Sequence, residues 1–69
     1  MTRETEFFIY LIERYARHKK TTADEILRQW DELGLTNFLY DMYEIYHSES
    51  LENAYADIDR LMEEKRSRS

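Results

Sequence analysis

The chain has 69 residues, a net charge of −5 at neutral pH and no cysteine. A chain this short forms a single domain and buries only about 60% of the surface that its unfolded form exposes, so its stability is marginal. Disulfides are excluded, and a structural zinc is disfavoured because His18 and His47 are the only strong nitrogen ligands. Stability must then come from good helix packing or from self-association.

The composition favours an all-α fold. Hydrophobic residues make up 42% of the chain, which is enough to build a core, whereas one glycine and no proline leave few of the turns that strands require. The longest apolar run, residues 7–12, is far shorter than the roughly 20 residues of a membrane span. It also follows acidic residues, where a signal peptide has a basic start. We expect a compact bundle of four short amphipathic helices in the cytoplasm, without membrane contact.

The first two predicted helices occupy the N-terminal half. Thr2 or Thr5 caps the first, whose inward face carries Phe8, Leu11, Ile12, Tyr15 and Lys19 at helical spacing. The second begins with a capping box, in which the Thr22 hydroxyl and the Glu25 carboxylate satisfy each other's backbone donors. It ends at Gly34, because glycine enters the left-handed conformation after a helix without steric cost. Its inward residues are Ala23, Ile26, Trp30 and Leu33.

Two further helices are predicted in the C-terminal half. The third starts near Thr36, and its spacing turns a set of apolar residues inward: Phe38, Leu39, Met42, Ile45 and Tyr46. The fourth follows Ser48 or Ser50 and carries a continuous stripe: Leu51, Ala54, Tyr55, Ile58, Leu61 and Met62. We expect residues 1–64 to form the helical domain and the basic residues 65–69 to fray as a tail.

Charge is distributed unevenly along the chain. Residues 1–20 hold five basic and three acidic side chains (+2), residues 21–62 hold two and ten (−8), and residues 63–69 hold three and two (+1). The acidic middle is either an ordinary solvated surface or a face that meets a basic partner, since charge asymmetry steers association.

The segments around Gly34 have the spacing of a helix-turn-helix. In such proteins the second helix enters the major groove of DNA. Here residues 36–46 contain two carboxylates and no lysine or arginine, so this helix would repel the phosphate backbone. The basic cluster at the end of the first helix is better explained as a set of cations that stabilise a helix C-terminus. Nucleic-acid binding is therefore disfavoured.

Aromatic residues are the best candidates for a functional surface. Tyr15, Tyr46 and Tyr55 fall on predicted core faces, whereas Tyr10 and Tyr40 point outward. Exposed tyrosines are typical of protein interfaces because they offer a large contact area at a small entropic cost.

His47 is the residue most suggestive of catalysis, since Tyr43 precedes it by four positions and carboxylates lie nearby in sequence. No nucleophile motif accompanies His47, however, and catalysis needs a second group and an oriented third. A histidine that caps the end of a helix is the simpler interpretation. We predict no catalytic, cofactor-binding or metal-binding residue, and we take the candidate partner-binding residues to be Tyr10, Tyr40, Tyr43 and His47.

The segment Tyr43-Glu44-Ile45-Tyr46-His47-Ser48, the later Asp57-Ile58 and the earlier Ile12-Glu13 resemble a known family across about residues 5–62. This is the bacterial domain of unknown function 3791 family, whose members carry Tyr-x-x-x-His-Thr and a closing Asp-Ile helix. The chain departs from the pattern at Tyr46, where the family often has leucine, and at Ser50, where it often has glycine. The resemblance brings no activity with it. Genes of the family often stand beside genes for ADP-ribosyltransferase-like proteins, which implies a partner or antitoxin-like role.

Three hypotheses follow. The first is a protein–protein interaction module that binds another protein or forms a homodimer. The second is a small DNA-binding regulator of the helix-turn-helix type. The third, an enzyme that uses His47, is the weakest, because a bundle of this size has little room for a substrate pocket of about 300 Å³ or more.

Overall fold

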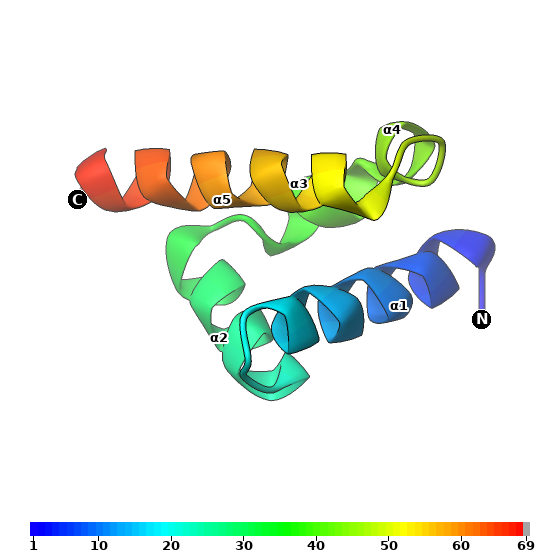
Figure 1. Ribbon diagram of the computed structural model, residues 1–69, viewed down its shortest axis with the longest axis horizontal. Coiled ribbons are helices and arrows are strands. Elements are labelled where there is room, and N and C mark those ends of the chain that lie inside the picture. The colour runs from blue at the N-terminus through cyan, green and yellow to red at the C-terminus, as the bar shows by residue number, and fades with distance from the viewer. Residues whose placement is uncertain (69) are drawn as a thin grey trace.

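The computed structural model describes residues 1–68, which form five helices and contain no strand (Figure 1). The all-α fold class is confirmed. The count differs from the predicted four because the third predicted helix is divided in two at Met42. The helices are α1 (Arg3–His18), α2 (Ala23–Leu33), α3 (Thr36–Asp41), α4 (Tyr43–Tyr46) and α5 (Leu51–Arg68).

Helices α1 and α5 form the two long sides of the molecule, with α2 at one end and α4 near the other (Figure 1). Their inward faces and the α2–α3 segment enclose a single core. Its buried members are Leu11, Ile12, Tyr15, Ala16, Ile26, Trp30, Leu35, Leu39, Tyr46, Ala54, Ile58 and Met62. Within residues 1–68 no helix is long and apolar enough to cross a membrane.

Local signals explain the boundaries of α2. The Thr22 hydroxyl accepts a hydrogen bond from the Glu25 amide at 3.2 Å, which confirms Thr22 as the N-cap. The second half of the predicted capping box is replaced, since the Glu25 carboxylate pairs with Arg28. At the other end Gly34 adopts φ +70°, and the Leu35 amide donates to the carbonyl oxygen of Trp30 at 2.8 Å. This pattern is a Schellman motif, whose following residue is usually apolar. Leu35 fills that place and is buried.

Helix α1 ends in the same way without a glycine. The Thr21 amide donates to the carbonyl oxygen of Ala16 at 2.9 Å, and Lys20 takes the left-handed conformation with φ +62°. A residue with a side chain is strained there, since glycine is the amino acid that enters this region freely. At the start of α1, the Thr2 hydroxyl accepts from the Thr5 amide at 3.1 Å, which confirms Thr2 as a cap.

The predicted continuous helix over residues 36–46 is wrong. The Met42 amide bonds to the carbonyl oxygen of Leu39, a tighter i to i−3 pattern, and the chain turns before α4 begins. The turn changes which side of residues 36–46 faces the core. Leu39 and Tyr46 are therefore buried in the core, whereas Phe38 and Ile45 lie at the surface. Phe38 is 48% exposed and Ile45 is 53% exposed, so their predicted burial is also wrong.

Helix α5 carries its predicted stripe inward, with Ala54, Ile58 and Met62 buried and Leu61 half-buried. We expected residues 65–69 to fray. In the structure α5 continues as helix to Arg68, and Ser69 lies outside the described residues. Basic side chains in the last turn favour this extension because they interact with the negative end of the helix dipole. Arg66 also donates to the Gln29 side chain of α2 at 3.2 Å.

Candidate functional site

Four rings gather where the first half of α1 meets α4, and we call Phe7, Tyr10, Tyr43 and His47 the aromatic cluster. The Phe7 ring is its centre, with centroids 5.6 Å from Tyr43, 6.3 Å from Tyr10 and 6.4 Å from His47. Phe7 meets Tyr43 edge to face at 78°, an arrangement that aromatic pairs prefer. Three of the four predicted partner-binding residues are therefore brought together.

Local geometry holds the α4 side of this cluster. Tyr43 and His47 are four residues apart, so their rings lie on the same side of the short helix, stacked at 4.3 Å with an angle of 2°. The Nδ1–H of His47 donates to the carbonyl oxygen of Tyr43 at 2.7 Å. The ring of His47 thus caps the end of α4, in line with the simpler of the two interpretations of this residue.

Together with His47, Tyr10 presents an exposed ring of the cluster to a partner. It is 47% exposed, whereas Phe7 and Tyr43 are half-buried. The Arg14 guanidinium lies 5.6 Å from the Tyr10 ring centroid, within the range of a cation–π contact. The candidate partner-binding residues predicted from the sequence did not include Phe7 and Arg14, which also belong to this surface. Their signal was the spacing of three and four residues from Tyr10, which places all three on one side of α1.

Tyr40 stands apart from the cluster, and its predicted outward orientation is wrong. It is half-buried, and its ring packs against Phe8 with centroids 5.5 Å apart. Its hydroxyl forms a hydrogen bond with the Thr5 hydroxyl at 2.7 Å. The side of α3 that carries Tyr40 therefore packs against the first half of α1. Tyr40 therefore serves as an internal contact between α3 and α1.

Two buried tyrosines fasten α5 to the rest of the molecule. The Tyr15 hydroxyl donates to Asp59, and the Tyr46 hydroxyl donates to Asp57. Burial and then the hydrogen bond to the carboxylate raise the pKa of both hydroxyls well above their ordinary value. Lys19 completes the first contact with an ion pair to Asp59 at 3.0 Å. The roles of these pairs are structural, because every polar atom in them is satisfied within the fold.

The same contacts shift the two carboxyl groups. The hydrogen bond from Tyr46 is the main cause that lowers the pKa of Asp57. For Asp59 burial acts to raise the pKa, but the hydrogen bonds from Tyr15 and Lys19 outweigh it and the pKa is lowered. Both carboxyls are therefore held in the ionised form more firmly than a free aspartate.

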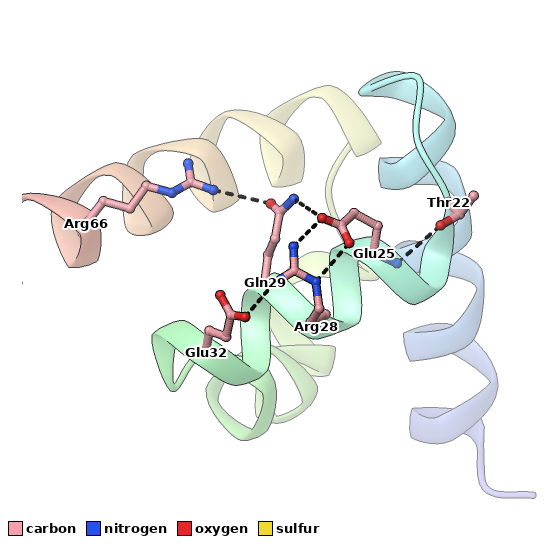
Figure 2. Close-up of polar contacts among 6 residues, drawn as sticks. All are labelled: Thr22, Glu25, Arg28, Gln29, Glu32 and Arg66. Carbon is pink, nitrogen blue, oxygen red and sulfur yellow. Dashed lines mark hydrogen bonds and ion pairs between the residues drawn. The ribbon is translucent and has the colours of Figure 1, made fainter.

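Two of the four acidic residues of α2, Glu25 and Glu32, are paired within the molecule (Figure 2). Arg28 lies between Glu25 and Glu32 and pairs with both. The Gln29 side chain accepts from Arg66 of α5 and donates to Glu25 (Figure 2). The carboxylates of Glu25 and Glu32 are therefore less available to a basic partner than unpaired ones would be.

The segment that resembles a helix-turn-helix lacks the geometry of a DNA reader. The helix that would enter the groove, α3, ends at Asp41 after six residues. The next helix, α4, has four residues and is separated from α3 by the turn at Met42. A recognition helix presents several side chains along one face of the groove, which needs a longer continuous helix.

Within residues 1–68 no group of three or more histidine, cysteine, aspartate or glutamate residues is placed to hold a metal ion. The two histidines lie on different helices: His18 at the end of α1, stacked on Tyr55 at 4.6 Å, and His47 at the end of α4. Their rings are packed against tyrosines rather than against a nucleophile.

The fold and this surface define a small all-helical protein with a partly exposed aromatic cluster. Its sequence matches a family over residues 6–65, described as "Protein of unknown function (DUF3791)". The chain belongs to this family, and the resemblance stated from the motifs is confirmed. No curated protein and no solved structure matches the chain.

Proposed function

We propose that this protein is a protein–protein interaction module that acts in the bacterial cytoplasm and docks a partner on the aromatic cluster. The proposal assigns it no enzymatic activity. The observation that carries the proposal is the environment of the Tyr10 side chain. It is 47% exposed, and its ring contacts both Phe7 and Arg14. A large ring that is already ordered loses little entropy on binding, and such residues are enriched among those that dominate interface energies.

The partner is either another protein or a second copy of the chain. The family resemblance favours a protein encoded by a neighbouring gene as the partner, with this chain acting as an antitoxin-like component or an adaptor. The alternative function, a helix-turn-helix DNA-binding regulator, gains no support from α3 and α4, which are short and carry no lysine or arginine. Specific nanomolar binding to duplex DNA at physiological salt would reverse this ranking.

Affinity capture with a matched pair of variants tests the proposal. The tagged chain is immobilised, extract from the native cells is passed over it, and retained proteins are quantified by mass spectrometry. Tyr10→Ala removes the exposed ring, whereas Ile9→Ala removes a neighbour of similar exposure (39%) that lies 100° further round the helix. Circular dichroism confirms that both variants are folded.

We expect at least one protein to be retained by the wild type and by Ile9→Ala but reduced at least about tenfold with Tyr10→Ala. Truncation of an interface anchor costs about 2 kcal/mol or more, which corresponds to a change of more than tenfold in affinity. If every retained protein responds equally to the two variants, the aromatic cluster is not the docking surface.

A further inference from the structure

Helix α1 carries a second stripe besides its core face. Residues 3, 7, 10, 14 and 17 follow one another at intervals of four, three, four and three, which is the spacing of the contact positions in paired helices. We call this set the outer seam; its members are Arg3, Phe7, Tyr10, Arg14 and Arg17. The core face uses other positions, among them Leu11 and Tyr15. At 1.5 Å per residue, the outer seam is about 21 Å long.

The arginines of the outer seam form no ion pair within the described residues, in contrast to three other cations. Within residues 1–68 Arg28, Arg60 and Lys19 each pair with carboxylates, whereas Arg3, Arg14 and Arg17 make no ion pair. Arg14 instead makes a cation–π contact with the Tyr10 ring. All three seam arginines are exposed. The seam therefore places positive charge on both sides of two aromatic rings, in a chain with a net charge of −5.

A groove continues the outer seam toward α5. It has a volume of about 280 Å³ and is lined by side chains of α1 and of the start of α5: Arg14, Arg17, His18, Leu51, Glu52 and Tyr55. The His18 ring stacks on Tyr55 at 4.6 Å and forms part of the wall. Glu52 is the single carboxylate in this lining, so the two arginines leave the groove positive.

We propose that the partner supplies an acidic amphipathic helix that lies along the outer seam; this deepens the proposed function and rests on it. Apolar side chains of that helix cover Phe7 and Tyr10, and its carboxylates reach Arg14 and Arg17 at one end and Arg3 at the other. Helix-in-groove recognition uses anchors at this same periodicity. Arginine suits the contact because its planar guanidinium binds a carboxylate with two parallel hydrogen bonds.

Charge decides between this occupant and two others. If the outer seam paired with the same seam of a second copy, arginines would meet arginines, which opposes that dimer. A nucleic-acid backbone has negative charge at every residue, and it would also meet Glu6, Glu13 and Glu52, which border the outer seam and its groove. A helix places carboxylates at chosen positions and avoids these three.

Binding of two designed peptides to the full chain tests the inference. Each peptide has three heptads with leucine at the a and d positions; one has glutamate and the other lysine at e and g, which also prevents either peptide from pairing with itself. Affinities are measured by fluorescence anisotropy at ionic strengths of about 0.1 M and about 1 M, between which the screening length falls from about 10 Å to about 3 Å. A single-stranded oligothymidine serves as a third probe.

The variants are matched in charge. Arg14→Glu combined with Arg17→Glu reverses two seam charges, and Lys65→Glu combined with Arg68→Glu makes the same charge change at the far end of α5. Arg14→Gln combined with Arg17→Gln is a milder version that keeps the helix propensity of these positions. Tyr10→Ala reports on the aromatic part of the surface.

We expect the acidic peptide to bind the wild type more tightly than the basic peptide, despite the net negative charge of the chain, and to weaken at high salt. Binding should fall at least about tenfold in the seam reversal, by a smaller factor in the glutamine variant, and remain unchanged in the α5 control. Equal binding of both peptides, an equal loss in the α5 control, or tighter binding of oligothymidine would overturn the inference.

Failure of this inference is distinct from failure of the proposed function. If neither peptide binds, or if both bind equally and both depend on Tyr10, the acidic helix is excluded as the occupant. Tyr10-dependent capture from cell extract would still support docking at the aromatic cluster in that case. Loss of Tyr10-dependence in the extract would remove the proposed function itself.

Discussion

Replacement of Trp30 by alanine tests the layout of the core. The side chain is 0% exposed and packs between Phe8 and Tyr15, each with ring centroids 5.8 Å from the indole. Truncation of a buried aromatic residue costs about 3–5 kcal/mol, because apolar contact is lost and a cavity remains. At about 0.05–0.15 kcal/mol per residue, this chain has a total stability of about 3–10 kcal/mol. Trp30→Ala therefore removes a large share of the stability or all of it.

Thermal unfolding followed by far-ultraviolet circular dichroism measures the effect, since the variant has no tryptophan fluorescence. For a domain of this size, a loss of 3 kcal/mol lowers Tm by about 12 °C or more. Leu27→Ala is the control: it lies on the same helix, and 37% of its surface is exposed. We expect its cost to stay below about 1 kcal/mol, because alanine also favours helix.

Trp30→Phe distinguishes the contribution of the buried aromatic ring to stability from that of the indole N–H. The Nε1–H of Trp30 is buried and has no hydrogen-bond partner in the described part of the chain. An unsatisfied buried donor costs about 1–3 kcal/mol, so its removal offsets much of the lost packing. We expect Trp30→Phe to unfold much closer to the wild type than Trp30→Ala does. An unchanged Tm in Trp30→Ala would refute the placement of this side chain at the centre of the core.

Three further measurements follow from the structure. Gly34→Ala should lower the free energy of unfolding in urea by about 1 kcal/mol, and Gly34→Asn should lower it by less. The cause is the left-handed φ of Gly34, since no atom lies within 4 Å of an added Cβ. Equal stability of the wild type and the two variants would contradict this explanation. Because the pKa values of Asp57 and Asp59 are lowered on folding, their stabilising contribution is present above about pH 4 and is lost as the pH falls further. The double variant Asp57→Asn with Asp59→Asn should therefore show a weaker dependence of stability on pH in the acid range. An unchanged acid profile would disprove this contribution. Light scattering tests the alternative in which the partner is a second copy of the chain. Such a homodimer should tighten as salt rises, because salt screens the repulsion between two negatively charged chains, and should weaken with Tyr10→Glu; a strict monomer at high protein concentration and high salt would exclude it.

The sequence predicted α2 almost to the residue because its signals are local. Thr22 and Glu25 identify its start, and Gly34 identifies its end, without reference to the rest of the fold. The end of α1 has the same hydrogen-bond pattern, but Lys20 occupies the left-handed position there. Nothing about a lysine indicates that conformation, so only the tertiary structure reveals it.

The errors arise where periodicity was extended through a turn that carries no breaking residue. Met42 is a good helix former, so the stripe that joins Phe38 to Ile45 looked continuous, yet the chain turns at Met42 and moves both residues to the surface. The pairing of Tyr43 with His47 was visible as a spacing of four. Their contact with Phe7 joins segments more than 35 residues apart and depends on how α4 meets α1, which no local pattern encodes.

The manner in which α5 is fastened has a consequence for the lifetime of the protein. Helices α1, α2 and α3 are neighbours in sequence as well as in space, whereas Asp59 reaches back 40 residues to Lys19 and Arg66 reaches back 37 residues to Gln29. Contacts of such long range form late in folding, because the chain between them must be ordered first. Local detachment of α5 would uncover the Tyr15 ring that packs against Tyr55, expose the buried residues Ala54, Ile58 and Met62 of α5, and present an unprotected helix to proteases. Where opening and closing of α5 are fast relative to cleavage, the rate of proteolysis follows the equilibrium for opening α5.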